Sequence, residues 1–322
     1  MASPRIELIA GTPIGAPNTE ARITDMVECQ KYVDVALDHG VKTFDTANGY
    51  SKGTAELWLG QLDLRNAAVD TKSSPYAPKA HSAENLRAAA LKSLADLGMQ
   101  HINVYYLHAP DRTVPFEETC GAINELYKDG LIKEFGLSNF NSWEVAEIYY
   151  LYKMNGWLLP SVYEGRYNAV DRVAETELLP CLRKFGIRFY AFSPLAGGLL
   201  SGNILSVEDF DKRPGTRWDP KITGFAGFLR NSAVPLLPII RHLVEELAKH
   251  DLSLTEAATR WLQHHSALDP ERGDKILVGA SLAQQLKTNL RLNALGPLPP
   301  LAVELINAAG EKCKGLNPHY AW

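Results

Sequence analysis

The sequence of 322 residues predicts an α/β fold of the (β/α)8 type, the TIM barrel. Short apolar runs alternate with segments of helical spacing eight times, which is typical of parallel sheets covered by helices. Polar residues follow most of these runs, at the strand ends where barrel enzymes carry their chemistry. No linker, charge block or internal repeat divides the chain, so we expect one domain over residues 1–322.

The expected strands are eight short runs rich in apolar and β-branched residues. They cover residues 6–10, 41–45, 67–72, 102–108, 132–137, 161–164, 188–192 and 275–279. Helices are predicted at residues 24–39, 54–59, 83–97, 116–128, 143–153 and 177–185, and one more follows the eighth strand. Ser82 and Ser253 are candidate N-caps, Gly98 is a candidate helix stop, and Ser281 is expected to open the last barrel helix.

Two regions depart from the repeat. Residues 201–234, after the seventh strand, are rich in Gly, Pro, Asp and Arg with little periodicity, and so long a loop is usually functional or disordered. Extra helices are predicted at 236–250, 255–264 and 301–312, and the last leads to an aromatic tail. We therefore expect a barrel with a long loop after strand seven, extra helices and a C-terminal aromatic tail.

Composition restricts the possible partners. The net charge is −4 and no basic cluster stands out, which argues against nucleic acid and favours a small molecule. The four cysteines form no CxxC pair, so neither a disulfide framework nor a metal site is indicated. The first residues lack the pattern of a secretory signal, and no run approaches eighteen apolar residues. We expect a cytoplasmic protein that does not bind membranes.

Four polar residues stand at or near the ends of three successive predicted strands. Asp45 ends the second strand, Tyr50 lies in the loop after it, and Lys72 and His108 end the next two. Strand ends of a barrel share one rim, so these side chains are expected to meet. An ammonium favours a phenolate, so Lys72, held by Asp45, is expected to lower the pKa of Tyr50 from about 10. Such a set suits protonation of a carbonyl oxygen while a cofactor delivers hydride.

Each of these residues alone also has a purely structural explanation. Tyr50 and Lys72 can be ordinary loop residues, and His108 can simply satisfy a strand-end carbonyl. Their joint occurrence on successive strand ends is harder to explain in that way. No Gly-x-Ser-x-Gly pattern indicates acyl transfer. His264 and His265 are neighbours, which do not share a helix face, so they are not expected to bind a metal.

Later strand ends add candidates for ligand binding. They are Ser138, Asn139, Glu164 and Ser193, followed by Gly197, Gly198 and Gly202. Glycines allow the backbone to approach a phosphate closely, although alone they are a weak signal.

Seven segments spread over nearly the whole chain carry a resemblance to a known family. They are FDTANGYSKGTAE, DTKSSPY, YYLHAPDRTVPFEET, FGLSNF, VYEGRYNA, FYAFSPLAGGLLSG and ILVGASLAQQLKTN. In these segments the chain resembles the aldo-keto reductases, and most of all their aflatoxin-aldehyde reductase (succinic-semialdehyde reductase) subgroup.

The resemblance implies an NADPH-dependent reduction of an aldehyde or ketone to an alcohol. Tyr50 would be the general acid, assisted by Lys72 and Asp45, and His108 would orient the carbonyl. Ser138 and Asn139 would hold the nicotinamide carboxamide. The full set that the resemblance assigns to NADPH/NADP+ is Asp45, Ser138, Asn139, Glu164, Phe192, Ser193, Leu195, Gly197, Gly198, Gly202, Asn203, Arg217, Ser281, Gln285 and Asn289.

The sequence departs from the family at two places. Glu164 stands where the family usually has a glutamine, and an ionised carboxylate can accept from the carboxamide but cannot donate to it. The subgroup's acid-binding arginine near the C-terminus is replaced by the Tyr320-Ala321-Trp322 ending, whereas Arg230 matches a second substrate-side arginine. We expect His108, Arg230 and Trp322 to contact the substrate, and the aromatic ending to favour a bulkier or more apolar carbonyl than succinic semialdehyde.

Two other functions are compatible with the same sequence. The site can work in the oxidative direction on an alcohol, or on a specialised metabolite. A non-catalytic NADPH-binding regulatory subunit is the alternative from a different class, since some relatives associate with channels. The complete set of Asp45, Tyr50, Lys72 and His108 argues against that alternative, because a binding module has no need of it.

Overall fold

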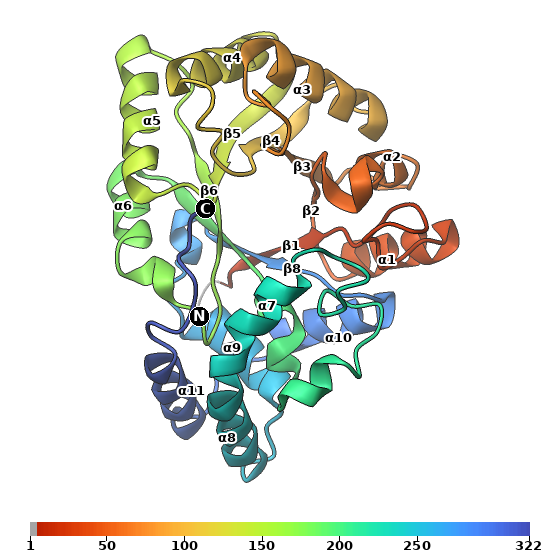
Figure 1. Ribbon diagram of the computed structural model, residues 1–322, viewed down its shortest axis with the longest axis vertical. Helices are drawn as coiled ribbons and strands as arrows, with labels where there is room; N and C mark the ends of the chain where they lie inside the picture. Colours follow the sequence, from red (N-terminus) through yellow and green to blue (C-terminus); the bar gives the residue numbers. More distant parts are fainter. Residues whose placement is uncertain (1–4) are drawn as a thin grey trace.

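Eight parallel strands form a closed barrel, in chain order, in the computed structural model, which describes residues 5–322 (Figure 1). β1 pairs with both β2 and β8 and so closes the barrel. The predicted (β/α)8 fold is confirmed, and the strand bounds differ from the predicted runs by at most two residues. The strands are β1 (Glu7–Gly11), β2 (Thr43–Asp45), β3 (Ala68–Ser73), β4 (Ile102–Leu107), β5 (Ile132–Ser138), β6 (Val162–Arg166), β7 (Arg188–Phe192) and β8 (Lys275–Val278).

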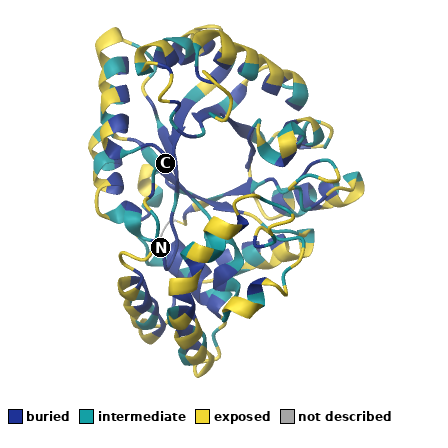
Figure 2. Ribbon diagram, in the orientation of Figure 1, coloured by how far each residue is buried: buried dark blue, intermediate teal, exposed yellow. Residues whose placement is uncertain are grey.

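Helices surround the barrel and expose their outer faces, whereas the strands are mostly buried (Figure 2). After the first six strands come α1 (Met26–Asp38), α2 (Ala55–Leu59), α3 (Ala83–Leu97), α4 (Phe116–Lys128), α5 (Ser142–Asn155) and α6 (Leu178–Phe185). Between β7 and β8 lie α7 (Ala226–Ala233), α8 (Leu237–Ala248) and α9 (Leu254–His264), and α10 (Ala283–Asn293) and α11 (Pro300–Lys312) follow β8. Every helix among residues 5–322 is too short or too polar to span a bilayer.

The predicted helix ends agree with the structure in part. The hydroxyl of Ser253 accepts a hydrogen bond from the backbone of Glu256 at 3.2 Å and caps α9, as expected. Gly98 ends α3 with a φ of 64°, which glycine adopts without strain. Ser82 stands at the N-cap of α3 but makes no capping hydrogen bond. The expectation for Ser281 is wrong by one residue, because Leu282 is the N-cap of α10.

The strand side chains alternate between two apolar cores. On β4, Val104 and Tyr106 point into the barrel, whereas Tyr105 and Leu107 belong to the larger core between strands and helices. The interior cluster consists of Ile9, Val104, Tyr106, Val162, Tyr190 and Leu277. Because apolar side chains fill the barrel's interior, polar chemistry is confined to the ends of the strands.

The segment after β7 is more regular than its sequence predicts. The expectation of little regular structure over residues 201–234 is wrong in part, since they include α7 and a 3-10 turn at Val207–Phe210. Phe210 and Trp218 are buried in this segment with ring centroids 5.1 Å apart. The residues between these two aromatic side chains show neither helical nor strand periodicity, so pattern reading misses the small core that they form.

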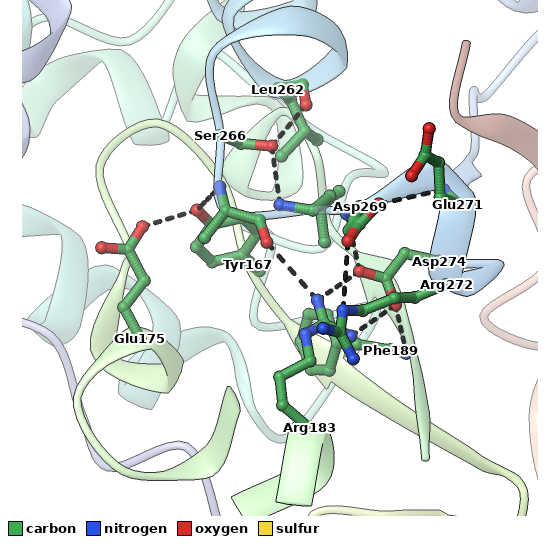
Figure 3. Close-up of polar contacts among 12 residues, drawn as sticks. Tyr167, Glu175, Arg183, Phe189, Leu262, Ser266, Asp269, Glu271, Arg272 and Asp274 are labelled. Carbon is green, nitrogen blue, oxygen red and sulfur yellow. Dashed lines mark hydrogen bonds and ion pairs between the residues drawn. The ribbon is translucent and has the colours of Figure 1, made fainter. Parts of the chain in front are cut away.

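A buried polar network connects α6, β7 and the segment that precedes β8 (Figure 3). The carboxylate of Asp274, which is 1% exposed, accepts hydrogen bonds from the backbone N–H groups of Phe189 and Asp269, both at 2.8 Å. The guanidinium of Arg183 also donates to it, at 2.9 Å through Nη1. Because a buried carboxylate is stable only with such partners, the network fixes how β8 meets β7.

We expect Asp274→Ala to lower the free energy of unfolding by about 3 kcal/mol, because Arg183 and two backbone donors lose their acceptor. Urea unfolding followed by circular dichroism measures the change. Glu271→Ala is the control, since the exposed side chain of Glu271 lies close by and donates or accepts no hydrogen bond within residues 5–322. Equal destabilisation by both variants would contradict the structural role of Asp274.

Candidate active site

Asp45, Tyr50, Lys72 and His108 lie together at the carboxyl ends of the strands. Asp45 is the last residue of β2, Lys72 lies in β3, and His108 directly follows β4. The ring centroids of Tyr50 and His108 are 5.5 Å apart with an interplanar angle of 74°. The Nζ atom of Lys72 lies 5.3 Å from the centroid of the Tyr50 ring. The structure thus brings together the four residues that were predicted to meet.

The loop that presents Tyr50 has an unusual backbone. Ser51 and Lys52 have φ values of 51° and 55°, a region that residues with side chains rarely adopt. The hydroxyl of Ser51 donates to the carbonyl of Ile14 at 3.0 Å. A Cβ atom on Gly15 would lie 2.4 Å from Cβ of Ser51, so the two segments approach as closely as glycine permits. These contacts hold the turn that directs Tyr50 to the end of the barrel.

Lys72 is fully buried and surrounded by oxygen atoms. Its ammonium donates to both carboxylate oxygens of Asp45 at 2.6 Å and to the carbonyl of Thr46 at 2.9 Å. An oxygen of Glu164 lies 3.4 Å from the same nitrogen. Burial alone would lower the pKa of Lys72, but the nearby carboxyl groups, above all the charge of Asp45, outweigh it and raise this pKa. Lys72 is therefore an ammonium near neutral pH.

The charge balance around Tyr50 differs from the expectation. Burial raises the pKa of the Tyr50 phenol above its usual value, Lys72 opposes this, and Asp45 and Glu164 add to it. The prediction that Lys72 lowers the pKa of Tyr50 is therefore wrong. Burial and the nearby carboxyl groups together outweigh the effect of the ammonium. A phenol of raised pKa stays protonated, and it can still protonate an alkoxide, which is a stronger base than a phenolate.

His108 is a neutral hydrogen-bonding group. Burial lowers the pKa of its imidazole to about 3, and the charges of Lys72 and His81 contribute to the lowering. Its Nδ1 atom lies 3.4 Å from the hydroxyl of Ser74, and its backbone carbonyl accepts from the side chain of Asn139 at 2.8 Å. A neutral imidazole has one N–H to donate, so His108 can bind a substrate oxygen without giving up a proton.

The residues expected to hold the nicotinamide occupy the ends of β5, β6 and β7. Ser138 pairs in register with Glu164, and the side chain of Asn139 donates to the hydroxyl of Ser138 at 3.0 Å. Phe192 is half-buried at the end of β7 and packs on the interior cluster of the barrel. One carboxyl oxygen of Glu164 is buried and has no hydrogen-bond partner in the structure. This group of side chains suits a planar ring that carries an amide.

Three glycines form the turn after β7. Gly197, Gly198 and Gly202 have φ values of 65°, 98° and 74°, which favour glycine. A Cβ atom on Gly197 would lie 2.9 Å from the side chain of Arg217. The side chain of this arginine therefore packs against the glycine turn. The Arg217 side chain is exposed and makes no hydrogen bond or ion pair with residues 5–322. The guanidinium of Arg217 is therefore available to bind an anion. The other predicted cofactor residues of this turn are Ser193, Leu195 and Asn203.

Three further predicted cofactor residues gather at the N-terminus of α10. The side chain of Gln285 accepts from the backbone of Ser281 at 3.1 Å, and Asn289 donates to the carbonyl of Gly279 at 3.3 Å. The N-terminus of a helix favours phosphate through its free N–H groups and its dipole. Contacts of these side chains with a cofactor stay predictions.

The two predicted substrate residues at the rim have different surroundings. Arg230 donates to the carbonyl of Trp218 at 2.7 Å and pairs with Asp211 at 2.7 Å, so its guanidinium is occupied within the long loop. Trp322 donates its backbone N–H to the carbonyl of Asn139 at 3.1 Å, and 53% of the residue is exposed. The C-terminal segment thus lies beside the predicted site, whereas contact of Arg230 with substrate stays a prediction.

Two residues near this site were missed from the sequence. Tyr76 is 62% exposed, and its ring centroid lies 6.4 Å from that of His108. Arg112 donates to the carbonyl of Trp322 at 2.8 Å and pairs with Glu144 at 2.7 Å, so it anchors the C-terminal segment. Tyr76 could have been noticed as a rim-loop aromatic residue four positions after Lys72. No sequence pattern predicts the contact of Arg112, which joins residues 210 positions apart.

A barrel with a tyrosine, a buried lysine–aspartate pair and a neutral histidine at its strand ends has the equipment of an oxidoreductase that acts on carbonyl groups. The chain belongs to the Aldo/keto reductase family, whose model matches residues 9–311. Members of this family act on carbonyl groups of small molecules and use a nicotinamide dinucleotide, and this chain is an oxidoreductase of that kind.

Several relatives cover almost the whole chain. An aldo-keto reductase of Pseudocercospora fijiensis (strain CIRAD86) is 40% identical over 301 residues, which are 90% of this chain and 100% of the relative. Aflatoxin B1 aldehyde reductase member 2 of Rattus norvegicus is 38% identical over 327 residues, 95% of this chain and 89% of the relative. Aflatoxin B1 aldehyde reductase member 4 of Homo sapiens is 40% identical over 295 residues, with 88% and 89% covered.

The environment of His108 predicts its titration. With a pKa of about 3, the imidazole of His108 should stay neutral from pH 8 down to pH 5, whereas a free histidine becomes protonated in this range. The ring signals of His108 in NMR spectra, assigned by their loss in His108→Asn, should not shift over this range. A titration with a midpoint near 6.5 would contradict the lowered pKa of this imidazole.

Proposed function

We propose that this chain reduces an aldehyde or ketone to an alcohol with NADPH and that Tyr50 is the general acid. The arrangement of three side chains carries the proposal. The phenol of Tyr50 lies beside the imidazole of His108, with the ammonium of Lys72 next to the same ring. This arrangement provides two hydrogen-bond donors for one carbonyl oxygen and a cation for the charge that the proton transfer leaves behind.

The protein's part in the reaction follows from these positions. The neutral imidazole of His108 donates a hydrogen bond that orients the carbonyl. Bound NADPH supplies the hydride for the carbonyl carbon. As negative charge develops on the oxygen, Tyr50 transfers its phenolic proton to it. The resulting phenolate is stabilised by Lys72, which Asp45 holds in place through hydrogen bonds of 2.6 Å.

The residues at the later strand ends would hold the cofactor. Ser138, Asn139 and Glu164 would bind the carboxamide, and Phe192 would stack on the nicotinamide. The turn of residues 193–203 would accommodate the pyrophosphate. The unpaired guanidinium of Arg217 and the N-terminus of α10 favour binding of a 2′-phosphate. NADPH carries this phosphate and NADH does not, so we expect NADPH to be the cofactor.

We expect Tyr50→Phe to lower kcat at least about 100-fold, because the variant lacks the proton donor and keeps the ring. Consumption of NADPH with a panel of aldehydes measures the rate, and fluorescence quenching shows that NADPH still binds. Tyr76→Phe is the matched control, since it removes a nearby hydroxyl that has no part in the proposed mechanism. Equal rates for wild type and Tyr50→Phe, or no consumption by the wild type, would refute the mechanism.

The rim favours a bulky, apolar carbonyl compound. Tyr76 and Trp322 are both largely exposed beside the site, and Trp322 is held there by Asn139 and Arg112. Arg230 is paired with Asp211, which argues against a free arginine for a substrate carboxylate. Two of the relatives carry aflatoxin B1 aldehyde in their names, which supports an aldehyde as the substrate.

We expect Trp322→Ala to raise the KM for aromatic aldehydes about threefold or more and to leave the KM for short aliphatic aldehydes unchanged, because only large substrates reach the indole. Steady-state kinetics with both substrate classes measure the effect. Trp143→Ala is the control, because Trp143 is similarly exposed, at 59%, but lies on α5 outside the site. An unchanged KM for aromatic aldehydes in Trp322→Ala would contradict the role of this residue.

A further inference from the structure

Glu164 is buried next to an ammonium that has no proton to give it. An ammonium has three protons, and three oxygen atoms of Asp45 and Thr46 already surround that of Lys72 at 2.6–2.9 Å. Oε2 of Glu164 lies farther away, at 3.4 Å, and receives no hydrogen bond from residues 5–322. Glu164 is only 3% exposed, so bulk water does not reach its carboxyl group. An ionised carboxylate in this position would be strongly unfavourable.

Protonation of Glu164 removes the unfavourable buried charge. The carboxyl groups of Asp45 and Glu164 flank one ammonium, since Nζ of Lys72 lies 2.6 Å from an oxygen of Asp45 and 3.4 Å from Oε2 of Glu164. Two carboxylates that flank one ammonium do not both ionise readily, and Asp45 is the one that binds Lys72. Burial raises the pKa of Glu164 well above its ordinary value, and the charge of Asp45 raises it further. Glu164 is therefore the partner that keeps the proton.

The remaining charged groups around Glu164 lead to the same assignment. The titratable groups near the pair are Tyr50, Lys72, Asp70 and, on β4, Tyr106. Lys72 is the one cation in this set. Asp45 pairs with it at 2.6 Å, so an ionised Glu164 would add an unpaired negative charge to the interior. Burial also raises the pKa of Asp70, to about 7, and its carboxylate accepts from the side chain of Asn103 at 2.7 Å.

We propose that Glu164 is a carboxylic acid that donates a hydrogen bond to Asp45 and that, in this neutral form, it faces the nicotinamide carboxamide. This inference rests on the proposed function for its cofactor. Glu164 is a positioning residue, because it acts through Asp45 and Lys72 and through the orientation of the carboxamide. It differs from the family's usual glutamine because it can ionise. Ionisation adds a negative charge beside the nicotinamide, which favours the positively charged ring of NADP+ over the neutral ring of NADPH.

Infrared spectra of the cofactor-free protein test the protonation directly. At pH 8 the wild type should show the carbonyl stretch of a buried carboxylic acid, and Glu164→Gln should lack this component. Asp70→Asn should keep it, because Asp70 is mostly ionised at this pH. A spectrum without this component in the wild type, or with an unchanged component in Glu164→Gln, would overturn the proposal.

Cofactor binding tests the consequence. We expect the ratio of the Kd for NADPH to the Kd for NADP+ to rise about three- to tenfold in the wild type over the pH range in which the infrared band of protonated Glu164 is lost. The ratio should stay flat in Glu164→Gln and rise as in the wild type in Asp70→Asn. Both cofactors carry the same phosphates, so phosphate ionisation cancels in the ratio.

Fluorescence quenching measures the two dissociation constants. An equal rise in wild type and Glu164→Gln, or no rise in the wild type, would overturn the proposed role toward the cofactor. Failure of the wild type to bind either cofactor at any pH would refute the proposed function instead. In that case the infrared comparison still decides whether Glu164 is protonated.

Discussion

The burial of one ammonium group determines the organisation of the site. Lys72 is fully buried, and it can remain charged there only because Asp45 and the carbonyl of Thr46 surround it. These partners come from β2 and the loop that follows it, so the ion pair fixes how β2 and β3 end relative to each other. Tyr50 extends from the same loop and lies above the same nitrogen. The interaction that stabilises the cation therefore also positions the phenol.

The same cluster explains why the site is close to electrically neutral. Burial favours neutral forms, and the pKa values of Tyr50, Glu164 and His108 all shift toward the uncharged species. Lys72 and Asp45 are charged as a pair. A preorganised site with fixed hydrogen-bond donors can stabilise the negative charge that develops on a carbonyl oxygen during reduction.

Most of the fold could be predicted from the sequence, because strand and helix periodicity are local properties. The eight strands, the helices between them and the positions of Asp45, Lys72 and His108 at strand ends follow from short stretches of chain. Closure of the barrel then requires those ends to meet. The regular structure within residues 201–234 could not be predicted, since it depends on the packing of Phe210 against Trp218 rather than on a repeat.

The sequence by itself therefore determined which residues stand at the rim. The alternation of strands and helices, and the residue that ends each strand, depend on the residues close by in the chain. The tertiary structure alone decided their electrostatics and their distant partners. The pKa of Tyr50 is raised rather than lowered because burial and carboxyl groups from separate strands act on it together. Arg112 holds Trp322 through a contact between residues 210 positions apart, which no local pattern encodes. Burial and long-range contact are properties of the folded chain, so they became visible only in the structure.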